Sequence, residues 1–147
     1  MMIVNRSAAS KAAELAILKY DGVMKINTHA HATRKKYISD IAGQDMMYLR
    51  KEAEAIEYMK LTGLADESGS VAPSLDKFPF LREDSMALGL TGVELSRIIL
   101  FKADQWAILG PKMEGLRVGA NNNVGRATSA VDIDFAVNDF LYIMGDF

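Results

Sequence analysis

Apolar residues recur in this chain mostly at intervals of three and four, which is the repeat of an amphipathic α-helix. The clearest stretch follows Thr91, where one side of the predicted helix carries Leu95, Ile98, Ile99, Ala103, Trp106 and Leu109. The pattern predicts a mainly α protein, a small helical bundle of two helical hairpins. Its N- and C-terminal segments are expected to be less regular and to contact partners.

Glycines and capping residues divide the periodic stretches into separate predicted helices. Gly22, Gly63 and Gly89 each follow a periodic stretch, at the place where a helix commonly ends. Ser7 is expected to cap the first helix, and Pro79 stands at the favoured first position of a later one. The predicted helices cover residues 7–20, 28–40, 44–62, 80–88 and 91–109.

Two further local patterns set expectations for the second half of the chain. Thr91 and Glu94 have the spacing of a capping box, in which each side chain accepts a hydrogen bond from the other residue's backbone N–H. Gly110–Pro111 is expected to end or kink the helix that begins after Thr91, because proline has no N–H to donate. The run 121–123, three asparagines, predicts a turn because asparagine is a poor helix former.

One domain is expected overall, in three parts. Residues 1–28 form an N-terminal helical segment, 29–120 the helical bundle core and 121–147 an apolar C-terminal tail. The predicted core includes Tyr48, Tyr58, Ile98, Ile99 and Trp106. The sequence allows either strand or helix in the tail. Residues 131–137 alternate between apolar and polar as in a strand, while residues 140–144 fit one face of a helix equally well.

Composition excludes several classes of function. Half of the 147 residues are apolar and the net charge is −2, so a core is available but the basic excess of a nucleic-acid binder is absent. No segment has the roughly 18 uninterrupted apolar residues of a membrane span. The chain has no cysteine, which excludes disulfides and thiolate metal sites. We expect neither nucleic acid nor membrane as a partner.

No pattern of residues predicts catalysis, a cofactor or a metal. His29 and His31 fall in helical sequence, where side chains two positions apart diverge. Asp132, Asp134 and Asp139 lack the glycine and distal glutamate of a calcium loop, and alternating acids usually form a solvated side. We therefore expect a protein that is not an enzyme, with no catalytic, cofactor-binding or metal-binding residue.

The C-terminal tail is unusually apolar for a chain end. Two interpretations stand equally: the tail packs on its own core, or it packs on a neighbouring subunit, because a large apolar patch is rarely left exposed on a monomer. Trp106 is expected in the core of the long helix, or else as an interface anchor. The interface candidates are Trp106, Phe135, Val137, Phe140, Leu141, Tyr142, Ile143, Met144 and Phe147.

Between about residues 30 and 120 the order of residues resembles a small helical module found in structural proteins of tailed bacteriophages, often associated with tail or tail-fibre genes. The module carries no known chemistry, so the resemblance implies a context and not a mechanism. Its carriers are Arg34, Tyr37, Ile38, Gly43, Gln44, Tyr48, Lys51, Glu54, Ala55, Leu81, Glu83, Thr91, Gly92, Ile98, Ile99, Trp106, Glu114 and Arg117.

The resemblance implies a structural virion component of a tailed bacteriophage, a tail or fibre-attachment protein that acts by protein–protein binding. It would be made in the host cytoplasm, bind other virion proteins and form a homo-oligomer within a symmetric assembly. Three alternatives stay open at this point. They are a capsid decoration or cement protein, a soluble assembly chaperone or adaptor, and a small enzyme with an unrecognised site.

Overall fold

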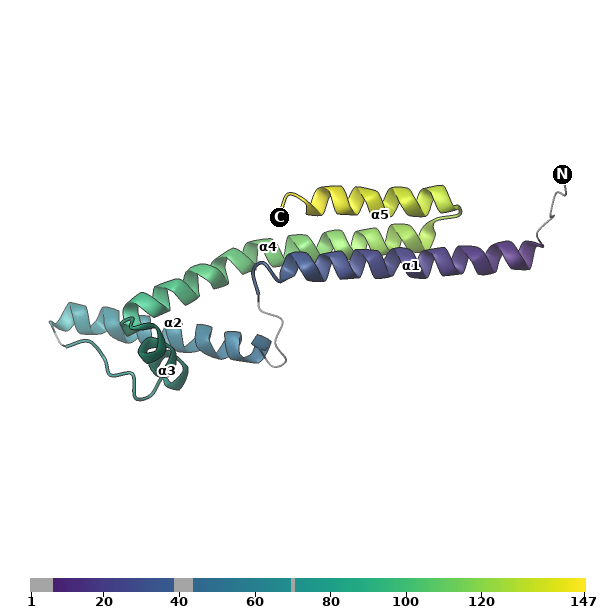
Figure 1. Ribbon diagram of the computed structural model, residues 1–147. Coiled ribbons are helices and arrows are strands. Elements are labelled where there is room, and N and C mark those ends of the chain that lie inside the picture. The colour runs from purple at the N-terminus through teal and green to yellow at the C-terminus, as the bar shows by residue number, and fades with distance from the viewer. Residues whose placement is uncertain (1–6, 39–43, 70) are drawn as a thin grey trace. The chain divides into compact units, whose positions relative to one another are not determined.

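A computed structural model describes residues 7–38, 44–69 and 71–147, and the regular secondary structure among them is helix, with no strand (Figure 1). The prediction of a mainly α helical bundle is confirmed. The described parts of both ends are more regular than expected, since each belongs to a helix. The five helices are α1 (Ala8–Arg34), α2 (Gln44–Ser68), α3 (Pro79–Leu88), α4 (Gly92–Arg126) and α5 (Ala130–Met144).

Contacts divide the chain into two compact units. The first contains residues 1–38 and 109–147, and the second contains residues 39–108. Helix α4 belongs to both, because the boundary falls between Ile108 and Leu109. This division differs from the three consecutive segments expected from the sequence, since the two ends of the chain share one unit.

The first unit packs α1 against α5 and against the second half of α4. Gly22 lies in the middle of α1, where an added Cβ would be 3.1 Å from Ile133 and 3.3 Å from Val137 of α5. The glycine therefore permits a close approach of helices, and it does not end α1. The prediction of two helices separated at Gly22 is wrong for this reason, and α1 continues to Arg34.

Helix α4 also runs further than the sequence predicted. It passes through Pro111 and through the asparagine triplet, and it ends at Arg126. Met113, Ala120 and Val124 on this stretch are buried within the first unit. Burial of this apolar stripe outweighs the low helix propensity of Pro111, which costs about 3 kcal/mol, and of the asparagines, which cost at most about 0.7 kcal/mol each. The helix therefore does not end at Gly110–Pro111, and the turn expected at the asparagines is wrong.

A polar cluster links α1 to α4 in the same unit. The Asn27 Oδ1 atom accepts hydrogen bonds from Arg117 Nη1 and from Asn121 Nδ2, both at 3.0 Å. Arg117 also pairs with Glu114 through two hydrogen bonds of 2.6 and 2.8 Å, which hold the pKa of the Glu114 carboxyl below its ordinary value. The cluster stabilises one register of the two helices, because sliding either helix would leave these groups unpaired.

The C-terminal tail is α-helix from Ala130 to Met144, which decides the question that the sequence left open. The Ser129 side chain caps it by accepting from the backbone N–H of Asp132 at 3.1 Å. One stripe of α5 is buried in the first unit: Ile133, Ala136, Val137, Phe140 and Met144. The tail thus packs on its own unit through that stripe.

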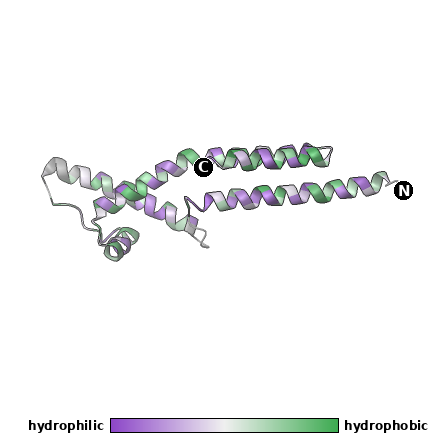
Figure 2. Cartoon of the chain, turned by 45° about the horizontal axis from the view of Figure 1, so that its top comes forward, coloured by the Kyte–Doolittle hydropathy of each residue, from purple (hydrophilic) through white to green (hydrophobic). Residues whose placement is uncertain are grey.

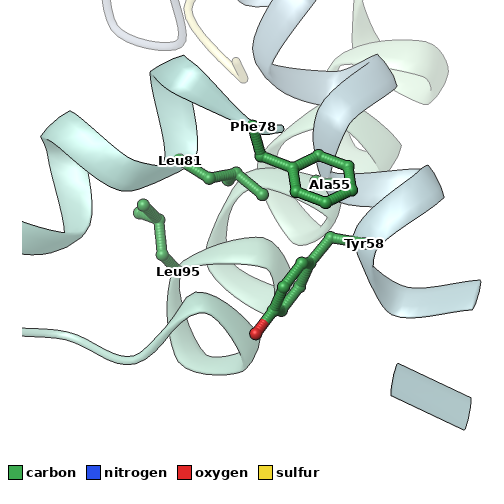
Figure 3. Packing of buried hydrophobic residues seen from close by; sticks show 5 residues of the cluster. All are labelled: Ala55, Tyr58, Phe78, Leu81 and Leu95. Atoms are coloured by element: carbon green, nitrogen blue, oxygen red, sulfur yellow. The ribbon is translucent and has the colours of Figure 1, made fainter. Parts of the chain in front are cut away.

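The second unit holds α2, α3 and the first half of α4 around a cluster of buried side chains (Figure 3). The rings of Tyr58 and Phe78 meet edge to face, with centroids 5.3 Å apart. The Tyr58 hydroxyl donates to the Pro73 carbonyl at 3.0 Å, so its polar end is satisfied. The cluster consists of Ala55, Tyr58, Phe78, Leu81 and Leu95.

The predicted core agrees with this cluster only in part. Tyr58 is buried as expected, while Tyr48, Ile99 and Trp106 are half-buried. Ile98 is exposed, which corrects its assignment to the core. A 3.6-residue period groups residues on a side of a helix, but it does not say which part of that side meets another element.

Two residues of α2 that carry the resemblance, Lys51 and Glu54, contact α3 in this unit. Phe78 precedes α3 and offers no side-chain cap, and Pro79 supplies no N–H. Glu54 of α2 takes the capping role, since its Oε2 accepts from the backbone N–H of Leu81 at 3.0 Å. One helical turn earlier, Lys51 forms an ion pair of 2.5 Å with Asp84.

The local caps predicted for α3 and for the start of α4 are confirmed, whereas the helix end expected at Gly63 is wrong, because α2 continues to Ser68. Helix α3 begins at Pro79 and ends before Gly89, whose φ of 67° lies in the left-handed region that glycine adopts most easily. The capping box is present, with Thr91 N–H donating to Glu94 at 2.9 Å and Glu94 N–H donating to Thr91 Oγ1 at 3.2 Å. The hydrogen bond from the Thr91 backbone lowers the pKa of the Glu94 carboxyl.

Replacing Glu54 with alanine is expected to lower the free energy of unfolding by about 1 kcal/mol, the usual cost of losing an N-terminal cap. The Leu81 N–H would lose its acceptor in a partly buried position. Urea unfolding measures the change. Glu57→Ala on the exposed side of α2 is the matched control and should change stability by less than about 0.5 kcal/mol. Equal effects of the two variants would contradict the capping role.

Candidate protein-binding surface

Helix α5 carries a second apolar stripe in addition to its buried one. Val131 is 76% exposed, Phe135 73% and Tyr142 82%. The intervals of four and seven residues place these three side chains along one line of the helix. We call this stripe the outer face of α5, defined by Val131, Phe135 and Tyr142, with Asn138 at its middle.

The outer face lies opposite the buried stripe. At 100° per residue, Phe135 and Tyr142 are on average about half a turn away from Ile133 and Phe140. The hydropathy colours of Figure 2 show apolar and polar positions interleaved along the helices, not segregated into blocks. A surface helix of a globular protein normally buries one apolar stripe and turns a polar side to water. Helix α5 has apolar stripes on two sides, and the described residues of the first unit cover only one.

Acidic residues border the outer face. Asp134 lies on one edge, while Asp132 and Asp139 lie on the other, and all three are exposed. Helix α5 contains no Lys, Arg or His. The surface therefore combines large apolar side chains with a negative border, which suits a partner that is apolar and positively charged.

The structure divides the predicted interface residues of the tail into three groups. Phe135 and Tyr142 are exposed on the outer face. Val137, Phe140 and Met144 are buried in the first unit, with the Phe140 ring edge-on to His29 at 6.2 Å between centroids. The half-buried remainder is Leu141, Ile143 and Phe147.

Trp106, the interface candidate outside the tail, is half-buried in α4 and lies in the second unit. Several exposed apolar residues that the sequence did not single out lie elsewhere on the long helices. Spacing alone could have grouped them, but it could not show that they stay exposed. They include Val131 on α5, Ile17, Tyr20 and Met24 on α1, and Phe101 and Ile108 on α4.

Other candidate chemistry is not brought together in the described part of the chain. His29 is half-buried beside Phe140, whereas His31 is exposed. Among residues 7–38, 44–69 and 71–147, no group of three or more His, Asp or Glu side chains lies close enough to hold a metal ion. None of the described helices is long and apolar enough to cross a membrane.

Comparison of the chain with protein-family models, with curated proteins and with solved structures gives no match.

Proposed function

We propose that this chain is a structural component of a tailed-bacteriophage particle, at the tail or a fibre attachment point, and that it acts by protein–protein binding. The supporting observation is the outer face of α5, where two aromatic side chains remain almost fully exposed on a helix whose opposite side is packed. Aromatic residues at such positions are enriched in interfaces.

The helical scaffold suits this role. Helix α1 spans 27 residues, so it provides a long rod within the first unit. Packing of the buried stripe of α5 against α1 holds the outer face in place on the first unit. Preorganised surfaces lose less conformational entropy on binding. The phage setting rests on the resemblance of residues 30–120 to the tail-associated module.

Mass spectrometry of purified particles tests the proposal. We expect the chain in the particles at a fixed ratio to the major tail protein. A double variant, Phe135→Ser with Tyr142→Ser, should fold normally and be lost from particles, because both side chains are exposed in the chain. Met86→Ser, an exposed apolar position on α3, is the control and should be incorporated. Absence of the wild-type chain from particles would contradict the proposal.

The same experiment separates an assembly chaperone or adaptor from a particle component. A chaperone would be needed for particle formation and would be missing from the finished particle. A capsid decoration protein would instead follow the major capsid protein in stoichiometry when heads and tails are purified separately.

A further inference from the structure

A second exposed apolar stripe lies on the first half of α4. Phe101 is 63% and Ile108 60% exposed, and Ile98 is exposed on the same side. Gln105 lies between Phe101 and Ile108 and is also exposed. The intervals of three, four and three residues place the four side chains on one face of the helix. We call this stripe the outer face of α4, defined by Ile98, Phe101, Gln105 and Ile108.

The charges around the outer face of α4 are mixed, with an excess of positive charge. Arg97, Lys102 and Lys112 are exposed on or beside it, against two acids, Glu94 and Asp104. Lys112 follows Ile108 by one helical turn. The outer face of α5 has three aspartates and no cation. The two faces therefore have opposite signs of charge around apolar centres, which is the arrangement that selects a partner and its register.

The two faces also agree in size and layout. The outer face of α5 extends over 12 residues, about 16 Å, and that of α4 over 11 residues, about 15 Å. Each has a phenylalanine and an amide side chain within its central turns, Phe135 with Asn138 and Phe101 with Gln105. Two helices can therefore pack along the full length of both stripes.

The exposed apolar face of α1 lacks this complementarity. On α1, the stripe of Ile17, Tyr20 and Met24 is bordered by Glu14, Asp21 and Lys25, a mixed set with an excess of acid. A second α5 helix would bring like charges together. An anionic membrane surface is also disfavoured, because helices that lie on such surfaces carry Lys and Arg on their polar side.

We infer that the outer face of α5 binds the outer face of α4 in a second copy of this chain. The inference rests on the proposed function and names one of its partners. Phe101, Phe135 and Tyr142 would each bury about 150–250 Å² in such a contact. Because every copy carries both faces, the contact either closes by reciprocal pairing or extends from copy to copy.

Disulfide trapping tests this pairing directly, since the chain has no cysteine of its own. Full-length Asn138→Cys and Gln105→Cys variants place one thiol at the middle of each face. Mixed under mild oxidation, they should form predominantly the heterologous cross-link, identified by mass spectrometry of the joined peptides. The control mixture pairs Asn138→Cys with Asp76→Cys, an exposed loop position, and should cross-link at least about tenfold less. Predominant Asn138→Cys self-linking, or no excess over the control, would overturn the inference.

Sedimentation of the chain without cysteine gives an independent measure. Wild type should self-associate, and Phe101→Ser or Phe135→Ser should each raise the dissociation constant at least about tenfold, as expected for truncation of an interface anchor. Association should weaken as salt rises, because screening reduces the attraction between the acidic and basic borders. A wild-type chain that stays monomeric at every protein and salt concentration tested would overturn the inference.

The two proposals fail in distinguishable ways. A chain that is incorporated into particles but gives no heterologous cross-link retains its structural role and loses the self-pairing. A chain that cross-links as expected but is absent from particles retains the self-pairing and loses the virion role.

Discussion

Phe140→Ala should lower the free energy of unfolding by about 3–5 kcal/mol, the usual cost of removing a buried phenylalanine side chain. Phe140 is 3% exposed on the buried stripe of α5 and meets the His29 ring of α1. Its loss leaves a cavity in the first unit, where neighbouring helices are held in register by the Asn27 hydrogen bonds. Such a cost is a large fraction of the roughly 5–15 kcal/mol that stabilises a typical domain.

Phe135→Ala is the matched control on the same helix. Phe135 is five residues away and points to the opposite side, so at protein concentrations where the chain is monomeric its replacement should change the free energy of unfolding by less than about 0.5 kcal/mol. Urea unfolding followed by far-ultraviolet circular dichroism measures both variants. Similar losses from the two would show that the outer face of α5 is covered in the folded chain. Single substitutions are preferable to removing residues 135–147, because truncation removes buried and exposed side chains together.

Leu81→Ala should cost about 2–5 kcal/mol in the second unit. Leu81 has no exposed surface and lies at the centre of the cluster with Ala55, Tyr58 and Phe78. Its backbone N–H is held by Glu54, which limits how far α3 can move to fill the cavity. The sole tryptophan, Trp106, belongs to this unit, so its fluorescence follows the unfolding.

Leu88→Ala provides the comparison within α3, since Leu88 is 63% exposed near the end of the same helix. Both substitutions remove the same atoms from the same type of secondary structure. A difference of less than about 1 kcal/mol between them would contradict the packing of α3 on α2, because burial is the property that distinguishes the two leucines.

Features that depend on neighbouring residues could be predicted from the sequence. The capping box at Thr91 and Glu94, the start of α3 at Pro79 and its end at Gly89 involve residues within four positions of one another, and all three are confirmed. The Ser7 cap of α1 is confirmed in the same way, with Ser7 Oγ accepting from Ser10 N–H at 3.1 Å. Such features are decided by φ/ψ preferences and short-range hydrogen bonds.

The candidate site was only partly predictable. The density of apolar residues in 131–147 predicted that the tail makes contacts, but it did not show which side of the tail is buried and which is exposed. Phe135 and Phe140 are equivalent in type and lie in the same apolar segment, yet one is exposed and the other buried. Their separation depends on which side of α5 meets α1.

By itself, the sequence determined that this chain is helical, where several of its helices are capped, and that it has apolar surface at its C-terminal end. These properties follow from backbone preferences and periodicity over a few turns. Only the tertiary structure decided that Gly22 and Pro111 lie inside continuous helices, that Glu54 caps a different helix, and which stripe of α5 is left open. Those outcomes depend on packing between residues distant in the chain, where burial of apolar surface outweighs local propensity.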